Sequence, residues 1–228
     1  MNYLTIITAR GGSKGIPKKN IKLLNGKPLI EYSIDIAKGI SELEDICFTS
    51  DSDEIISIAQ HCGLIVDFKR PAHLATDTAN SRDVMLHALE AHEKLRAKTY
   101  DAIVLLQPTS PFRTLAQVKG AISNYQQHLD MVVSVKAASA NPYYNLYEDS
   151  NGYLSPSKQG NFTRRQDCPD VWEVNGAIYV INTTSLRTKT MKSFSKIKKF
   201  KMDEKSSLDI DTPLDWKIAE MYLKEKDS

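Results

Sequence analysis

The chain has 228 residues, of which 41% are hydrophobic and 25% are charged, a composition typical of a globular protein with a substantial core. Thirty Lys and Arg residues against twenty-eight Asp and Glu leave a net charge of +2, which does not favour nucleic acid or an anionic membrane as a partner. Three cysteines without C-x-x-C spacing exclude a disulfide framework and a cysteine-rich zinc site. Without a signal-peptide pattern or a membrane-length apolar run, we expect a cytoplasmic protein.

The positive charge is concentrated in two segments. Residues 1–30 contain six cations and no acid, and residues 187–205 contain eight cations and two acids. The rest of the chain is therefore net acidic. The first segment requires a functional explanation. The sequence suggests no function for the second segment.

Strand-length apolar runs alternate with helix-period segments up to about residue 136, which predicts parallel strands joined by crossover helices. The expected strands are 3–9, 45–50, 64–68, 102–106 and 131–135. The expected helices are 28–38, 53–61 with Ser52 as its cap, 81–94 and 115–127.

The alternation stops in residues 137–174, which are polar and rich in Asn, Ser, Tyr and Pro. A turn signal at 150–152 predicts a hairpin excursion in place of another crossover. Strands at 177–181 and 197–202 and a final helix follow. Thr212 is the expected cap of that helix, with Pro213 at its first position and Asp215 three residues after the cap.

A basic, glycine-rich loop follows the first strand. Its glycines are Gly11, Gly12 and Gly15, and its main cations are Arg10, Lys14 and Lys19. Ligands of open α/β sheets bind beyond the carboxyl ends of strands, and exposed backbone N–H groups beside cations suit a polyphosphate. The spacing matches neither the dinucleotide fingerprint nor the P-loop, and a solvated basic loop is the alternative.

Asp209 and Asp211 stand two residues apart before the final helix. In an extended segment such a pair points to one side, so both carboxylates can bind one hard cation such as Mg²⁺. From these residues alone, a cap or turn role for Asp211 is the stronger interpretation. Asp51 and Asp53 are a second possible metal pair, but there we favour a helix start, where acids suit the helix dipole.

The loop A-R-G-G-S-K-G-I-P-x-K-N resembles the opening motif of the acylneuraminate cytidylyltransferases, the CMP-sialic acid synthetases. Seven further segments resemble blocks of this family in the family's order, and they span nearly the whole chain. They are residues 27–30, 50–55, 70–77, 105–111, 164–167, 175–177 and 209–212. Eight ordered blocks form a highly specific match.

The resemblance implies a three-layer, Rossmann-like α/β fold of the nucleotide-diphospho-sugar transferase type, with a mixed, mostly parallel sheet. Residues 1–136 and 175–228 would form the nucleotidyltransferase domain, and residues 137–174 a dimerisation and sugar-site excursion. The implied reaction moves CMP from CTP to the anomeric hydroxyl of a nine-carbon 2-keto sugar acid and releases pyrophosphate, with Mg²⁺. The implied partners are CTP, a nonulosonic acid and a second copy of the chain, without nucleic acid or membrane.

The family also implies a role for each matching residue. Arg10, Lys14 and Lys19 would be catalytic and hold the triphosphate, and the nucleotide-binding set would be Gly11, Gly12, Ser13, Asn20, Arg70 and Ser81. Gln107, Arg165 and Asn175 would bind the sugar, and Asp209 and Asp211 the metal. On the residues alone, the alternative for Gln107 is a turn residue, and a surface role for Arg165 is about equally favoured. No side chain is assigned as the base for the sugar hydroxyl.

The chain departs from part of the family at two positions. Some bacterial sialic acid enzymes carry a lysine and an arginine where this chain has Tyr144 and Glu173, so the sugar stays open between N-acetylneuraminate and legionaminate types. Alternative functions are a Kdo cytidylyltransferase and a catalytically silent nucleotide-binding protein. Nucleic-acid binding through the basic run 196–201 is less favoured than protection of an edge strand.

Overall fold

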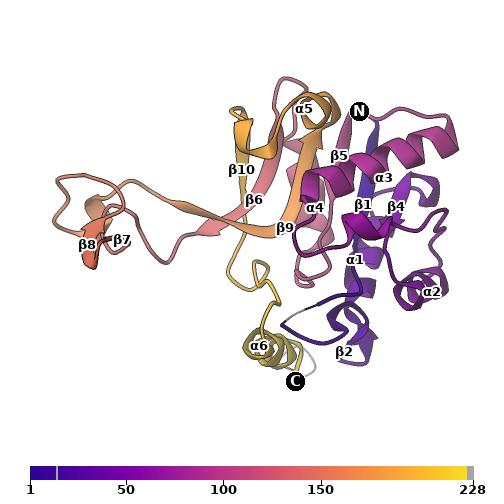
Figure 1. The fold of residues 1–228 in the computed structure, drawn as a ribbon, viewed down its shortest axis with the longest axis horizontal. Coiled ribbons are helices and arrows are strands. Elements are labelled where there is room, and N and C mark those ends of the chain that lie inside the picture. Colours follow the sequence, from indigo (N-terminus) through magenta and orange to yellow (C-terminus); the bar gives the residue numbers. More distant parts are fainter. Residues whose placement is uncertain (14, 225–228) are drawn as a thin grey trace.

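A computed structural model describes residues 1–13 and 15–224, in which a six-stranded sheet has helices on both faces (Figure 1). The strand order is β10-β6-β9-β5-β1-β4, with β9 antiparallel to both of its neighbours and the other pairs parallel. The strands are β1 (Tyr3–Thr8), β4 (Ile46–Thr49), β5 (Ala102–Leu105), β6 (Met131–Ala137), β9 (Trp172–Asn182) and β10 (Ile197–Lys201). The expected three-layer, mostly parallel α/β fold is confirmed.

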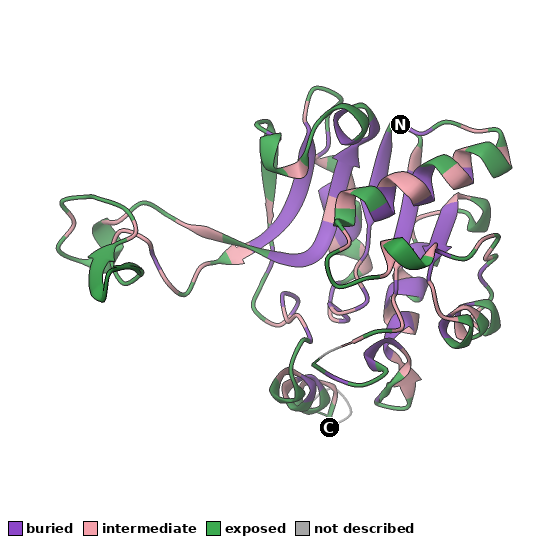
Figure 2. Ribbon diagram, in the orientation of Figure 1, coloured by how far each residue is buried: buried purple, intermediate pink, exposed green. Residues whose placement is uncertain are grey.

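Two hydrophobic clusters sandwich the sheet. The helices α1 (Leu29–Lys38), α2 (Asp53–His61) and α4 (Leu115–Ser123) pack on one face, and α3 (Ser81–Arg96) and α5 (Thr183–Thr188) pack on the other. Along β1, Ile7 belongs to the first cluster while Leu4 and Ile6 belong to the second. A strand that is buried on both faces has a nearly continuous apolar sequence, as β1 does. Figure 2 shows this strand as buried.

A third cluster joins the two ends of the chain. The short ribbon of β2 (Leu23–Leu24) and β3 (Lys27–Pro28) turns through Asn25 and Gly26, whose φ angles are 49° and 75°. Leu24 packs with Ile210 and with Trp216 of α6 (Pro213–Lys224). This packing fixes the segment before α6 against the N-terminal loop.

The predicted N-terminus of α6 is confirmed. Thr212 N donates to Asp215 Oδ2 at 2.7 Å, and Asp215 N donates to Thr212 Oγ1 at 3.3 Å. These reciprocal hydrogen bonds form a capping box. They hold residues 209–211 in a fixed position before the helix.

The expected strand at 64–68 is wrong, and several boundaries differ. Leu64 is buried, but the backbone rejoins the edge strand only where Arg70 N donates to Ser50 O at 2.8 Å. Alternating apolar residues indicate that one face of a segment is buried. Such burial does not require a partner strand. The helix expected to reach residue 127 ends at Ser123, where Asn124 N and Nδ2 both donate to Gly120 O.

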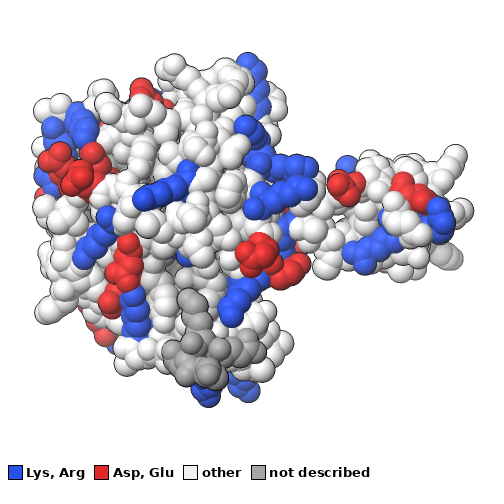
Figure 3. Space-filling view, turned by 180° about the vertical axis from the view of Figure 1, so that it is seen from behind, with Lys and Arg blue, Asp and Glu red and all other residues white. Residues whose placement is uncertain are grey.

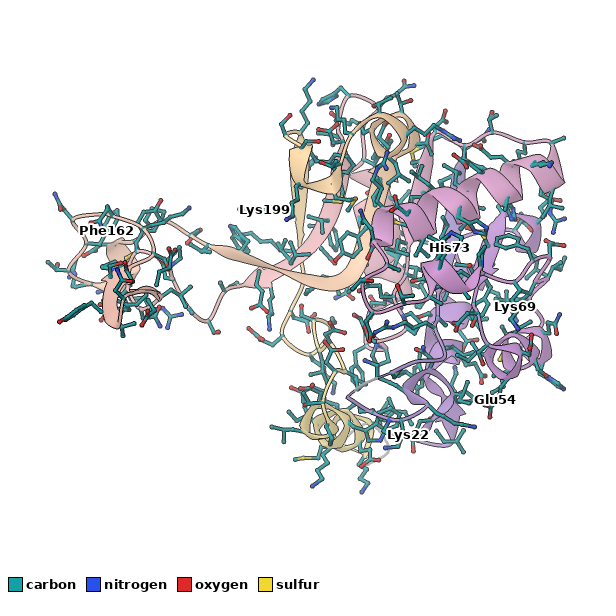
Figure 4. The ribbon with its side chains drawn as sticks, in the orientation of Figure 1. Lys22, Glu54, Lys69, His73, Phe162 and Lys199 are labelled. Carbon is teal, nitrogen blue, oxygen red and sulfur yellow. The ribbon has the colours of Figure 1, made fainter. Side chains whose placement is uncertain are left out.

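β6 and β9 continue past the sheet into a projecting arm, residues 138–171 (Figure 1). The predicted hairpin is present as β7 (Tyr147–Ser150) and β8 (Tyr153–Pro156), and every residue in these two strands is exposed. Inside the arm, where Figure 4 labels Phe162, the ring of this residue packs edge to face on Tyr143 with centroids 5.5 Å apart. The arm therefore buries little of its own apolar surface (Figure 2).

Within the two described ranges, no helix has the length and apolar character needed to cross a membrane.

Candidate active site

A pocket of about 600 Å³ lies beyond the carboxyl ends of β1 and β5. Its walls are the basic loop after β1, the start of α3, the loop after β5 and the segment before α6. The sequence-predicted residues that line it are Arg10, Ser13, Lys19, Asn20, Arg70, Ser81, Gln107, Asp209 and Asp211. Residues from both ends of the chain therefore meet where a ligand of an α/β sheet is expected.

Gly15 of the basic loop is required by a close contact, and Gly11 anchors the loop through its backbone. A Cβ placed on Gly15 would lie 2.1 Å from the carbonyl oxygen of Asp211, so a side chain there would push the two walls apart. Gly11 N donates to Asp51 Oδ1 at 3.0 Å, which anchors the loop to the end of β4. A Cβ on Gly12 would have no neighbour within 4 Å, and Lys14 lies outside the described residues.

Two predicted phosphate-binding cations form ion pairs at the pocket. Arg10 Nη1 lies 2.8 Å from Asp77 Oδ1, and Lys19 Nζ lies 2.8 Å from Asp211 Oδ1. Lys19 also donates to the carbonyl oxygen of Ile210 at 2.7 Å, and its side chain is only 11% exposed. An anionic ligand that enters the pocket would compete with these two carboxylates for the cations.

Two of the predicted nucleotide-binding residues, Asn20 and Arg70, are held by backbone oxygens. Asn20 Nδ2 donates to the Arg10 carbonyl at 2.9 Å, and Arg70 Nη2 donates to the Thr49 carbonyl at 2.6 Å. Burial lowers the pKa of Arg70 to about 10, and the nearby Asp51 charge opposes this shift. Ser81 is the first residue of α3, directly after the Asn80 cap.

Gln107 lies at the wall where β5 ends. Its carbonyl oxygen accepts a hydrogen bond of 2.6 Å from Arg113 Nη2. Across from it, Gly176 has a φ of 76° beside a register shift between β6 and β9. A Cβ on Gly176 would lie 3.0 Å from Gln107 Oε1 and 3.5 Å from Asp209 Oδ2, so these three residues are close neighbours.

Two predicted sugar-binding residues do not line this pocket. Asn175 is buried, where its Oδ1 accepts from Ser134 Oγ at 2.6 Å and its Nδ2 donates to Ser207 Oγ at 2.8 Å. These bonds stabilise the bend of β9. Arg165 lies in the arm, where its Nη2 donates to the Ser139 carbonyl at 2.8 Å.

Asp209 and Asp211 have different environments. Burial raises the pKa of Asp209, a hydrogen bond from the Thr109 side chain lowers it, and the Asp211 charge raises it. Asp209 Oδ1 is buried and has no hydrogen-bond partner among the described residues. The Asp211 side chain is 70% exposed and pairs with Lys19. Both residues line the pocket.

This donor set fits Mg²⁺. In the described ranges, no three His, Cys, Asp or Glu side chains gather closely enough to hold a metal by themselves. Mg²⁺ usually binds one or two carboxylates and completes its shell with phosphate oxygens and water. The unpartnered Asp209 Oδ1 and the pocket-lining Asp211 suit that mode.

The other acidic pair forms a helix start, as favoured from the sequence. Ile55 N donates to Ser52 Oγ at 3.4 Å, and Asp53 Oδ2 lies 2.7 Å from Lys69 Nζ outside the pocket. Asp51 instead holds the Gly11 loop.

The chain resembles known proteins over nearly its whole length. Residues 4–226 match a family model described as cytidylyltransferase. The chain belongs to the cytidylyltransferase family. This cytidylyltransferase is 38% identical over 224 residues to the post-translational flagellin modification protein B of Campylobacter coli, which covers 98% of this chain and 95% of that protein. It is 36% identical, with the same coverage, to the CMP-N,N'-diacetyllegionaminic acid synthase of Campylobacter jejuni.

A solved structure shows the same fold. CMP:2-keto-3-deoxy-manno-octonic acid synthetase complexed with CTP superposes on this cytidylyltransferase with a TM-score of 0.70 at 18% identity. The match covers 99% of this chain and all of that chain.

Three residues of the site were not assigned roles from the sequence. Asp77 was visible within a family block but had no role until its contact with Arg10. Thr109 bonds Asp209 from the loop after β5. Arg113 directly follows that loop and is buried, although nothing in the local sequence distinguishes it from a surface arginine.

Proposed function

We propose that this cytidylyltransferase transfers CMP from CTP to the anomeric hydroxyl of a nine-carbon 2-keto sugar acid and releases pyrophosphate. The observation that carries the proposal is the convergence of Arg10 and Lys19 with Asp209 and Asp211 in one pocket beyond β1. Cations and a carboxylate pair at one site suit a nucleoside triphosphate with a divalent metal. The resemblance to the C. jejuni synthase supports the sugar acid as acceptor.

The chain's residues act mainly by positioning and charge stabilisation. The anomeric hydroxyl oxygen attacks the α-phosphorus and releases its proton to water. The bond from the α-phosphorus to the oxygen that bridges to the β-phosphate breaks, and negative charge builds up on the departing pyrophosphate. Arg10 and Lys19 exchange their carboxylate partners for phosphate oxygens and so stabilise that charge. Asp209 and Asp211 would hold Mg²⁺, which would further neutralise the charge of the phosphates.

A legionaminic-type acid is the proposed sugar. Tyr144 is exposed on the arm, and Glu173 lies 3.6 Å from Lys136 and adds negative charge where other branches carry an arginine. The sugar carboxylate would therefore be bound differently from the lysine-and-arginine branch. The 36% identity to a diacetyllegionaminic acid synthase points the same way.

The arm is the proposed dimer contact. Its exposed large apolar side chains are Tyr144, Leu146, Tyr147, Tyr153 and Leu154. A small segment with so much exposed apolar surface and little core needs a partner surface. In a dimer, Arg165 would contribute to the sugar site of the neighbouring subunit. Sedimentation as a monomer at micromolar concentration would contradict this proposal.

A cytoplasmic location stays a prediction.

The function is tested with a panel of sugar acids. The protein is incubated with CTP, Mg²⁺ and either N,N'-diacetyllegionaminate, N-acetylneuraminate or Kdo, while released pyrophosphate and the CMP-sugar are measured. We expect the fastest release with diacetyllegionaminate and the slowest with Kdo. Binding of CTP without turnover on any sugar would instead identify a catalytically silent nucleotide-binding protein.

A further inference from the structure

Arg113 is a buried cation whose hydrogen bonds all go to neutral oxygens. It is 3% exposed, and its contacts in the described part of the chain are with backbone carbonyls and a hydroxyl. Removing a guanidinium from water is costly unless nearby groups compensate for the lost solvation. The nearby negative charge is Asp209, which acts on Arg113 electrostatically across the site.

The guanidinium joins three elements beside the Gln107 wall of the pocket. Nη1 donates to the Ala177 carbonyl of β9 at 2.6 Å, and Nη2 donates to the Gln107 carbonyl after β5 at 2.6 Å. Nη2 also donates to Ser33 Oγ on α1. Arg113 therefore fixes the backbone on both sides of the contact between Gln107 and Gly176.

The same region contains buried polar atoms that the described residues leave without a hydrogen-bond partner. These atoms are Arg113 Nε, Ser110 Oγ and Asp209 Oδ1. Buried polar groups are nearly always paired, so a concentration of unpaired groups is a feature of functional sites more than of structural cross-links. The loop after β5 and the Asp209 segment that faces it thus carry more buried polar groups than the fold requires.

We propose that Arg113 is a positioning residue for cytidylyl transfer, whose guanidinium holds the Gln107 loop and the Gly176 bend at a fixed spacing opposite Asp209. This inference rests on the proposed function. A fixed spacing aligns the acceptor hydroxyl with the α-phosphate, and small displacements of such groups lower rates strongly. Arg10 and Lys19 come from a different loop, so we expect CTP affinity to depend little on Arg113.

The test compares Arg113→Lys with Asp130→Asn. Lysine keeps the charge but lacks the planar fork that reaches two carbonyls at once. Asp130 is a matched control because it is 2% exposed and bonded to Ser185 and Lys189 at the opposite end of the sheet, outside the pocket. For each protein, kcat and the KM for the sugar are measured together with CTP affinity by calorimetry and Tm.

We expect Arg113→Lys to lower kcat/KM for the sugar about tenfold or more, with CTP affinity within about twofold of the wild type. Asp130→Asn should lower Tm and leave both kinetic constants unchanged. Wild-type sugar kinetics in Arg113→Lys, or an equal kinetic loss in Asp130→Asn, would overturn the inference. If Arg113→Lys does not fold, Ser33→Ala removes one guanidinium partner and should raise the sugar KM a few-fold; unchanged kinetics in Ser33→Ala would then refute the proposal.

Inactivity of the wild-type protein would bear on the proposed function and not on the role of Arg113. Absence of pyrophosphate release from the wild type with every sugar would refute the proposed function itself, because each variant is measured against that activity.

Discussion

The two basic regions of the chain carry similar charge in different surroundings. In the N-terminal loop, Lys19 is nearly buried and bonded to Asp211 at the pocket. Along β10, an edge strand of the sheet, Lys199 and Lys201 lie over the Trp172 ring, 4.0 and 4.4 Å from its centroid. Basic side chains gather along this edge beside the arm (Figure 3), and Lys199 stands there on β10 (Figure 4).

The difference shows that burial and partners, more than the number of cations, decide what a basic segment does. A cation held at a pocket wall by carboxylates is ready to exchange them for phosphate oxygens. Lysines on an edge strand discourage pairing with another chain, as expected for residues 196–201. Three pairs of changes compare a residue at the pocket with a similar residue outside it, and a fourth change concerns a carboxylate that pairs with the second basic region.

The largest effect is expected for Asp211→Ala. This change removes a proposed metal ligand and the partner of Lys19, so turnover should fall about a thousandfold or more while the fold persists. Asp53→Ala is the matched control, because it also removes a carboxylate from a lysine, at 2.7 Å, but away from the pocket. Pyrophosphate release at limiting Mg²⁺ measures both, and near-normal release by Asp211→Ala would remove this residue from the metal site.

The next effect concerns the two kinds of lysine. Lys19→Met should lower kcat/KM for CTP about a hundredfold, because a positive charge facing the triphosphate is lost. Lys199→Met removes the same charge from the β10 edge and should leave kcat/KM unchanged. Equal losses in the two variants would mean that overall charge, and not position, governs CTP use.

A smaller effect separates the glycines of the loop. Gly15→Ala should reduce the free energy of unfolding by about 2 kcal/mol and weaken CTP binding, because the new Cβ collides with the Asp211 carbonyl. Gly12→Ala has open space and should change stability by less than about 0.5 kcal/mol. Urea unfolding and CTP titration of both proteins measure the contrast, which a stable, CTP-binding Gly15→Ala protein would refute.

The smallest effect is a pH dependence in the second basic region. Hydrogen bonds from Lys189 and Ser185 hold the pKa of Asp130 well below its ordinary value. Because the folded pKa is depressed, this carboxylate stabilises the protein above its unfolded pKa, and the contribution, about 2 kcal/mol, is lost as the pH falls through the folded pKa. Unfolding at pH 7 and below pH 4 should therefore show a smaller acid-induced loss in Asp130→Asn than in the wild type. Equal losses in the two proteins would contradict this assignment.

Local signals in the sequence predicted most of the fold. The Ser52 and Thr212 caps, the buried β1 and the turn between β7 and β8 depend on neighbouring residues, and the structure contains each of them. The strand at 64–68 was wrong, because backbone pairing depends on distant segments. The β2–β3 ribbon was missed although it is local and its Asn25–Gly26 turn is a hairpin signal.

The site was predictable where motifs carry the chemistry. Lys19 and Asp211 come from opposite ends of the chain, and the family resemblance was needed to bring them together. The family resemblance placed Asn175 at the pocket, but its buried amide bonds to Ser134 and Ser207. The burial of Arg113 depends on α1, β5 and β9 together, so no local pattern reveals it.

The most direct test of the account follows individual phosphorus atoms of CTP. The wild-type protein is incubated with Mg²⁺, diacetyllegionaminate and CTP labelled either at the α-phosphate or at the γ-phosphate. We predict that the α label appears in the CMP-sugar and the γ label in pyrophosphate. An α label that remains in CTP or free CMP, or a γ label released as orthophosphate, would contradict transfer of CMP by this pocket.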